Sequence, residues 1–306
     1  MSGAGVLARI ATFCALLAGV AACDGDAPQT VPADSGAEAL RAVVAAEKSL
    51  VYTGYKRTIH GEEGVGRATR MKVSRSAAGR TLLEWGDEGG QPARRWAYKS
   101  RFAWLDDPAL LLRNYTVEVD PADGPAVAWR DTRHLKIRSR RPGRPSLDLL
   151  VDKETSLVLR EEMRDFDGKL WLTNVFDTID YRAPDETAAG EPPAEPLAES
   201  GSADRSAAMP LRVTAPPDGF VRTGGVRSEC GGVREDWTDG LAAFSVIERT
   251  AEPAAAGVTE GELQRRACSG RATVSGRFSG VDVTIAGNLP AAELETVVRG
   301  LAVVRQ

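Results

Sequence analysis

The chain has 306 residues, of which 42% are hydrophobic and 27% are charged, and its formal net charge is −4 at pH 7. These values are typical of an ordinary globular protein that is long enough for one large domain or two modest ones. The slightly acidic balance gives no reason to expect nucleic acid as a general partner. Downstream of the N-terminal leader, no apolar run approaches the roughly 20 residues that a membrane span needs.

The first segment has the pattern of a leader. An apolar run from Ile10 to Val20 follows one basic residue, Arg9. The run is too short to cross a membrane but has the size of the apolar core of a secretory signal peptide. The sequence Val20-Ala21-Ala22-Cys23 resembles a bacterial lipobox, in which the chain is cut before the cysteine and the cysteine is acylated. We therefore expect residues 1–22 to be a lipoprotein signal peptide and Cys23 to be a lipid anchor facing the periplasm. A plain signal peptide with an incidental cysteine is the alternative.

Residues 23–34 are small, polar and contain proline, which is typical of a flexible spacer between an anchor and a domain. Asp24 follows the anchor directly. In enteric bacteria an aspartate at this place tends to keep a lipoprotein on the inner membrane. Asp24 therefore favours an inner-membrane location in the cell envelope, and a random polar spacer residue is the alternative.

The first predicted domain covers residues 35–182. A capping-box pattern at Ser35-x-x-Glu38, followed by apolar residues at near-helical spacing, predicts a helix over about Ala37–Ser49. Short β-rich segments follow, including Arg95–Trp104 as two strand halves joined by a turn. Pro108–Leu112 is predicted to be a short helix whose leucines cap an apolar cavity, and strands resume from Asn114 to Tyr181. Short turns between consecutive strands predict an antiparallel meander of about ten strands in a large curved sheet.

Residues 183–209 are predicted to be a disordered acidic linker, because acidic residues alternate there with Pro, Ala, Gly and Ser without an apolar period.

A smaller α+β domain is predicted over residues 210–306. Ala272–Arg277 and Val281–Ala286 form a hairpin pattern around Ser279-Gly280. Pro290 opens a last helix with Leu294, Val297, Val298 and Leu301 on one face, and Gly300 marks its end.

Cysteine usage agrees with export. Cys14 leaves with the leader and Cys23 is used for the lipid, so only Cys230 and Cys268 remain in the mature chain. An exported compartment favours a disulfide between such a pair. Two separate free thiols are the alternative. Neither cysteine lies in a Cys-x-x-Cys pattern, so a redox enzyme is not expected.

No pattern in the sequence predicts catalysis. The chain has only His60 and His134, without a second His at helical metal-binding spacing, and it has neither a Gly-x-Ser-x-Gly elbow nor a phosphate-binding loop. Asp165-x-Asp167-Gly168 lacks the later acidic ligand of a calcium loop and predicts a hairpin turn instead. We expect a protein that is not an enzyme and that needs no metal or cofactor.

Two sets of residues are candidates for binding. The first is a basic cluster on two predicted strands and their turn, which could hold anionic lipid headgroups or an acidic partner peptide. Its members are Arg133, Lys136, Arg138, Arg140, Arg141 and Arg144. A solvated outer sheet face, or one neutralised by the acidic linker, is the alternative. The second set could line an apolar trough, although tryptophans in strands are commonly ordinary core. Its members are Trp85, Trp96, Trp104, Trp129 and Trp171.

Several segments, in this order, resemble the MucB/RseB family of periplasmic regulators of extracytoplasmic-stress sigma factors. They are Leu50-Val51-Tyr52-Thr53-Gly54, the run from Leu147 to Thr155 with Leu157–Arg160 and Asp165–Gly168 behind it, Pro217-Asp218-Gly219-Phe220, the run from Asp239 to Val246, and the run from Val283 to Pro290. Together they cover most of residues 37–306. The resemblance implies a mainly β (α+β) fold. Its first domain would be an unclosed antiparallel β-barrel with helices on the concave side, similar to the LolA/LolB lipoprotein carriers, with a lipid-sized apolar trough.

The resemblance also implies a function. A member of this family binds a membrane-anchored anti-sigma factor, shields it from regulated proteolysis, and releases it when the trough senses a misplaced envelope lipid. A lipid or lipoprotein carrier of the LolA/LolB type is the alternative, and a purely structural envelope lipoprotein is a third hypothesis. The second domain favours the regulator, because simple LolA-type carriers lack it. The sequence departs from the family in carrying a lipobox, since its best-known members are soluble, and in its cysteine pair.

Overall fold

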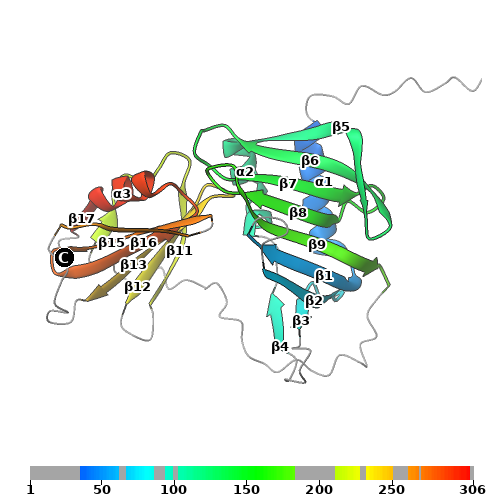
Figure 1. Cartoon of the computed structure of the whole chain (residues 1–306), viewed down its shortest axis with the longest axis horizontal. Coiled ribbons are helices and arrows are strands. Elements are labelled where there is room, and N and C mark those ends of the chain that lie inside the picture. Colours follow the sequence, from blue (N-terminus) through cyan, green and yellow to red (C-terminus); the bar gives the residue numbers. More distant parts are fainter. Residues whose placement is uncertain are drawn as a thin grey trace, which may run out of the picture. The chain divides into compact units, whose positions relative to one another are not determined.

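The computed structural model describes residues 35–61, 67–85, 94–98, 103–182, 211–227, 232–250, 261–268 and 270–303. The predicted signal peptide, Cys23, the spacer and the acidic linker lie outside these residues, as do Cys230 and the side chain of Cys268. The described chain forms a large sheet module over residues 35–182 and a small module over residues 211–303 (Figure 1). None of the described helices is long and apolar enough to cross a membrane.

The large sheet has nine antiparallel strands in the order β4-β3-β2-β1-β9-β8-β7-β6-β5. Its edge strands β4 and β5 do not pair with each other among the described residues, so the sheet is unclosed, as predicted. The strands are β1 (Tyr52–His60), β2 (Arg67–Arg75), β3 (Thr81–Trp85), β4 (Arg94–Tyr98), β5 (Tyr115–Val127), β6 (Arg130–Ser139), β7 (Ser146–Asp152), β8 (Val158–Arg164) and β9 (Leu170–Asp180). Most neighbours in the sheet are also neighbours in sequence, which is the meander that the short turns predict.

Helix α1 (Ser35–Ser49) packs on one face of this sheet (Figure 1). Its buried residues Leu40, Val43 and Val44 join one apolar cluster with alternate residues of β6 and β7, because side chains two apart on a strand share a face. The strand residues in this cluster include Leu135, Ile137, Leu147 and Leu149, each at most 1% exposed. Truncating one of these leucines to alanine would lower the free energy of unfolding by about 2–5 kcal/mol. This cluster therefore holds helix α1 against the face of the sheet.

The segment between β4 and β5 differs in part from the sequence prediction. The expected second strand half within Arg95–Trp104 is wrong, because Ala103–Leu105 is a 3₁₀ helix, η1, whose Trp104 is 3% exposed in the same cluster as α1. Helix α2 (Pro108–Asn114) follows, with Pro108 at its start and the Asp107 carboxylate accepting from the Leu110 N–H at 2.9 Å. The predicted helix is therefore confirmed, and it runs two residues beyond Leu112.

The small module has a six-stranded antiparallel sheet in the order β11-β12-β13-β16-β15-β14 and a two-stranded sheet of β10 and β17. Its strands are β10 (Leu211–Val213), β11 (Val221–Arg227), β12 (Val233–Thr238), β13 (Ala243–Thr250), β14 (Gln264–Cys268), β15 (Arg271–Phe278), β16 (Val281–Gly287) and β17 (Leu301–Val303). Helix α3 (Ala291–Arg299) buries Leu294, Val297 and Val298 against this sheet. Leu301 was expected on the helix face, but it lies in β17 and pairs with Val213, because the helix ends at Gly300.

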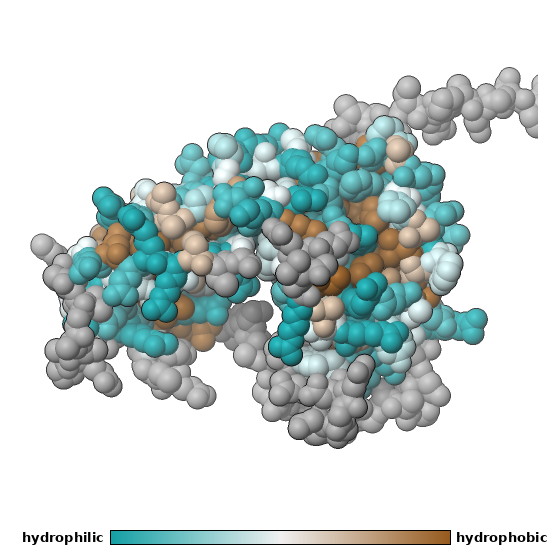
Figure 2. All heavy atoms as spheres, in the orientation of Figure 1, coloured by the Kyte–Doolittle hydropathy of each residue, from teal (hydrophilic) through white to brown (hydrophobic). Residues whose placement is uncertain are grey.

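The viewed surface is mostly hydrophilic, with apolar side chains exposed among the polar ones over both modules (Figure 2). Only four large hydrophobic side chains of the described residues are clearly exposed: Tyr55, Trp129, Val226 and Val303. Trp129 differs from the other three, because 95% of its surface is exposed whereas theirs is 43–56% exposed.

Candidate functional site: the concave interior and the module junction

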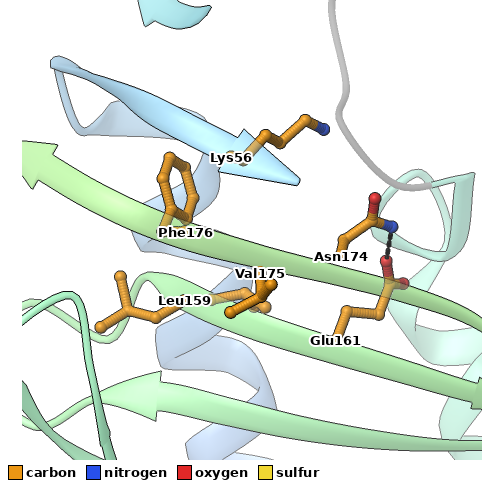
Figure 3. Close-up of a pocket in the computed structure, with 7 residues that line it drawn as sticks. Lys56, Leu159, Glu161, Asn174, Val175 and Phe176 are labelled. Carbon is orange, nitrogen blue, oxygen red and sulfur yellow. Dashed lines mark hydrogen bonds between the residues drawn. The ribbon is translucent and has the colours of Figure 1, made fainter. Parts of the chain in front are cut away.

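The first candidate site is a small hollow in the wall of the half-barrel (Figure 3). Its lining residues come from β1, β8 and β9 and are Lys56, Val158, Leu159, Glu161, Asn174, Val175 and Phe176. The hollow has a volume of about 10 Å³, which is the room that one water molecule needs. This hollow is far smaller than the lipid-sized trough that the family resemblance implies, and side chains of α1, η1 and α2 pack against the large sheet in one apolar cluster.

The hollow is polar in part because Glu161, at 2% exposure, lies inside the half-barrel. Its carboxylate accepts from Asn174 Nδ2 at 2.7 Å and from Trp104 Nε1 at 3.5 Å. The Thr58 hydroxyl donates to Asn174 Oδ1 at 2.6 Å, which fixes the amide so that its nitrogen faces Glu161. Lys56, at 6% exposure, pairs in register with Phe176 and so shares this face. No pattern in the sequence signals these groups, because single polar residues in strands have no characteristic spacing.

The second candidate site is a buried polar junction between the two modules. On the half-barrel side, Asn114 ends α2 and is 3% exposed. Its amide nitrogen donates to the carbonyls of Asp239 at 2.8 Å and Gly219 at 3.1 Å, both in the small module. Its amide oxygen accepts from Arg141 Nη1 at 2.9 Å. The polar atoms of Asn114 are thereby satisfied away from water, which is the condition for burying an amide at no large cost.

Asp239 is the acidic centre of this junction, and it is 2% exposed. The Tyr115 hydroxyl lies 3.0 and 3.1 Å from its two carboxylate oxygens and donates to the carboxylate. The backbone N–H groups of Leu241 and Ala242 donate to Oδ1 at 3.1 and 2.8 Å. Burial raises the pKa of Asp239, and these donors pull that pKa back down. Burial, together with the neighbouring Asp239 charge, also raises the pKa of Tyr115, so its hydroxyl stays protonated and can donate.

Arg144 supplies the positive charge of the junction. Its side chain is 5% exposed, and its Nε lies 3.3 Å from Asp239 Oδ2. Both terminal nitrogens donate to the Glu293 carboxylate at the start of α3, in the paired geometry that guanidinium and carboxylate groups favour. The guanidinium also lies 5.3 Å from the centre of the Phe220 ring. One arginine of the half-barrel therefore contacts three separate segments of the small module.

The β12–β13 turn completes the junction with apolar contacts. Gly240 has φ +109°, and a Cβ built there would lie 2.7 Å from Leu111 Cα of α2, so only glycine fits. Leu241, next in the chain, is 8% exposed and belongs to the apolar cluster of α1 and the large sheet, whereas Ala242 belongs to the core of the small module. The two cores thus meet at consecutive residues, and we call this whole contact the module junction.

The structure explains two motifs that the sequence analysis could only match to a family. Pro217-Asp218-Gly219-Phe220 supplies the Gly219 carbonyl and the Phe220 ring, and the run that begins at Asp239 supplies the turn. Nothing in the sequence signalled that Asn114 and Tyr115 would meet them, since more than a hundred residues separate the partners along the chain.

The structure divides the predicted basic cluster. Arg144 is buried in the junction and Arg141 contacts Asn114, so neither belongs to an open basic face. Lys136 bonds Asp120 at 2.6 Å and Arg138 bonds Asp148 at 2.7 Å, which neutralises both cations across neighbouring strands. Arg133 and Arg140 are exposed, but Arg133 lies on the opposite sheet face from Lys136 and Arg138 by strand alternation. A single basic face of six residues is therefore not what the fold presents.

The predicted trough-lining tryptophans are also dispersed. Trp104 is buried beside Glu161, and Trp85 packs against the cluster around Tyr52 and Phe176, so these two do face the interior. Trp171 lies against Gly270 and the Arg271 guanidinium of the small module. Trp129 is almost fully exposed in the β5–β6 turn, which is not the environment of a lining residue. The side chain of Trp96 lies outside the described residues.

The described residues contain no group of three or more His, Cys, Asp or Glu that could hold a metal ion. Their buried polar groups instead join elements to each other. The architecture is an unclosed antiparallel half-barrel with helices on one face, joined through a buried polar contact to a small α+β module.

Known structures share this architecture. The complex of Pseudomonas aeruginosa MucA and MucB matches with a TM-score of 0.68 and 19% identity, over 89% of this chain and 100% of that chain. A crystal structure of MucB in complex with MucA(peri) gives a TM-score of 0.66 at 19% identity with the same coverage. MucB alone gives 0.57 at 18% identity, over 88% of this chain and 98% of that one. No protein-family model and no curated protein sequence matches the chain. The fold is therefore that of MucB, with both modules in the same order.

Proposed function

We propose that this protein is an extracytoplasmic regulator that binds the exposed part of a membrane-anchored anti-sigma factor and shields it from proteolysis. The observation that carries the proposal is the likeness to MucB in its complexes with MucA, which extends over 89% of the chain and includes both modules. The residue motifs of the two modules support the same family independently of the fold. The protein acts by binding and not by catalysis.

The module junction supports this reading because it makes one platform from two domains. A partner segment that contacts both modules gains affinity when their relative arrangement is fixed before binding, since less ordering is then needed. The buried hydrogen bonds of Asn114 and Asp239 and the buried ion pair of Arg144 with Asp239 supply such fixation. A simple carrier of the LolA type would have no use for this second module.

Lipid sensing is the second half of the proposal. Side chains of α1, η1 and α2 pack against the large sheet in one apolar cluster, and the hollow beside Lys56 has a volume of about 10 Å³. A lipid chain that enters this cluster would displace side chains of α1 or α2. Because α2 also carries Asn114 at the junction, entry at that place would loosen the contact between the modules. This coupling gives lipid binding a route to partner release.

The location and covalent features are part of the same proposal. The lipobox at Cys23 would anchor the chain in the envelope, and Asp24 favours the inner membrane, where an anti-sigma factor resides. Cys23→Ala should move the protein out of the membrane fraction, and its retention there would contradict the anchor. A disulfide between Cys230 and Cys268 would staple the small module. Two reactive thiols per chain in denatured, unreduced mature protein would contradict that disulfide.

The direct test is a mild-detergent pull-down of the tagged full chain from its own membranes, with co-purifying proteins identified by mass spectrometry. Stoichiometric recovery of a single-span anti-sigma factor supports the regulator. Recovery of lipid or of other lipoproteins without such a partner supports the carrier of the LolA/LolB type instead. A Gly240→Ala variant should recover less partner than a Gly280→Ala variant, because Gly240 faces Leu111 at the junction and Gly280 has no atom within 4 Å of its added Cβ.

A further inference from the structure

The exposed Trp129 has no role in the junction or in the interior. It occupies the two-residue turn between β5 and β6, whose last and first residues, Val127 and Arg130, pair directly. Both turn residues have positive φ, 50° for Ala128 and 62° for Trp129. Turns of this kind strongly prefer Asn-Gly, because side chains with a Cβ crowd the backbone in this region. A bulky aromatic residue is thus held, against local preference, at the place where it is most exposed.

Contacts of the residues next to Trp129 fix the conformation of this turn. Arg130, which follows Trp129, donates from Nε to Asp152 Oδ2 at 2.9 Å and from Nη2 to Glu154 at 2.5 Å. Its guanidinium lies 5.3 Å from the centre of the Tyr181 ring, and the Tyr181 hydroxyl donates to the same Asp152 carboxylate at 2.5 Å. Val127 and Ala128 pack into the apolar cluster of the half-barrel. The indole is therefore presented by an ordered platform and not by a loose loop.

We infer that Trp129 is a second membrane contact, which inserts its indole into the interfacial region of the bilayer that carries the anchor; this rests on the proposed acylation of Cys23. Indole combines an apolar ring with one N–H donor, and tryptophan is enriched at membrane–water interfaces for that reason. Both cations beside it are held in ion pairs, Arg130 with Asp152 and Glu154 and Lys153 with Asp123, so neither is a bare charge at the bilayer surface. The partner of Trp129 is therefore the lipid bilayer itself, whatever the charge of its headgroups.

Chain length permits this contact. Gly36, at the start of α1, packs against the backbone of Val117 in β5, and Val117 pairs with Ile137 of β6. From Ile137 to the turn, seven residues of β6 rise about 23 Å at roughly 3.3 Å per residue. Residues 24–34 can extend about 36–40 Å at roughly 3.3–3.6 Å per residue, so the spacer is long enough for the anchor and the turn to reach one bilayer surface. Tethering turns a weak insertion by one side chain into a local event at high effective concentration.

The test uses lipidated full chain in phosphatidylcholine vesicles whose acyl chains are brominated, because bromine quenches tryptophan emission only on close approach. Brominated vesicles should quench the wild-type protein and the Trp171→Phe control, whose mutated tryptophan packs against Gly270. The Trp129→Phe variant should lose most of that quenching. The quenched fraction should change little between low and high salt, since the inserted indole is uncharged and phosphatidylcholine has no net charge.

Equal quenching of the Trp129→Phe variant and the wild type would overturn the inference. The inference would also be overturned if the fluorescence of Trp129 were unchanged by vesicles and shifted only when partner protein is added, because Trp129 would then contact protein. Flotation of the same vesicles separates this inference from the anchor. Loss of flotation in the Cys23→Ala variant reports the acyl anchor. The difference in quenching between the two Phe variants, measured on protein that has floated, reports Trp129.

Discussion

Asp239 is a single carboxylate on which both modules depend. It is 2% exposed, yet it accepts from the Tyr115 hydroxyl and from two backbone N–H groups, and it lies 3.3 Å from the Arg144 guanidinium. A buried carboxylate of this kind is tolerated only because every partner is present. Removing it leaves the Tyr115 hydroxyl and Arg144 Nε buried without it.

We expect Asp239→Ala to lower the free energy of unfolding by about 3 kcal/mol or more, because breaking a buried charge pair from one side typically costs about 3–5 kcal/mol. The matched control is Asp282→Ala, which also removes an arginine partner, Arg277, but at a carboxylate whose side chain is 44% exposed. That control should cost about 0–1 kcal/mol. Urea denaturation measures both, and equal losses in the two variants would contradict the assigned role of Asp239.

Glu248 gives the small module a pH dependence. Burial, and secondarily the nearby Glu235 charge, raises the pKa of Glu248 to about 7, although the Leu211 N–H donates to one of its carboxylate oxygens at 3.3 Å. Glu235 itself bonds Arg222, which leaves Glu248 without a cation of its own in the described contacts. In the unfolded chain the carboxyl returns to its ordinary pKa of about 4.5. Between these two values the folded state binds more protons than the unfolded state.

Stability should therefore fall as the pH rises from about 4.5 to about 7, and Glu248→Gln should flatten this fall because its amide never ionises. The urea midpoint of the wild type and of the variant, recorded across that range, measures the difference. Glu262→Gln is the control, since Glu262 is exposed and the substitution should leave the profile unchanged. A Glu248→Gln profile parallel to that of the wild type would refute this account.

At the scale of elements, the β12–β13 turn decides how closely the modules approach. Gly240→Ala places a Cβ 2.7–2.8 Å from the Leu111 backbone, whereas Gly280→Ala meets nothing within 4 Å, and both positions have positive φ. The alanine at Gly280 should cost about 1 kcal/mol from backbone strain alone. The alanine at Gly240 should cost about 2 kcal/mol more, because backbone atoms must shift. Chemical denaturation of the two variants side by side isolates the junction contact, and equal costs would show that this close approach is unimportant.

Other helices and strands show which features a sequence pattern can predict and which it cannot. Helix α1 and the hairpin of β15 and β16 were predictable, because their apolar spacing and turn residues act over a few neighbours. The strand predicted at η1 is wrong, because tryptophan is common in strands and a local pattern does not show that Trp104 packs in the cluster with α1. Cations at Lys136 and Arg138 looked like one basic face, because their acidic partners Asp120 and Asp148 come from other strands. Pairing between strands is long-range, and local patterns do not contain it.

At the scale of the whole molecule, the position of Leu241 joins two cores that the sequence presents as separate domains. Leu241 packs in the half-barrel cluster, whereas Ala242, the next residue in the chain, packs in the core of the small module. Opening either core would therefore expose a residue whose neighbour in the chain belongs to the other core. Domain contacts within a chain are commonly weaker and more polar than this, and relative motion is then the default expectation. Here the polar part is buried and hydrogen-bonded, which makes it costly to open.

We therefore expect the unlipidated mature chain to unfold in one cooperative thermal transition, with calorimetric and van't Hoff enthalpies that agree. Leu241→Ser removes the apolar side chain from the half-barrel cluster while keeping the turn, and it should split the transition into two, because the modules then unfold with their own stabilities. Val303→Ser, at a side chain that is 56% exposed, is the control and should keep one transition. Two transitions in the wild type would mean that the modules are independent domains, and the junction could then not carry a signal from the half-barrel to a partner bound on both.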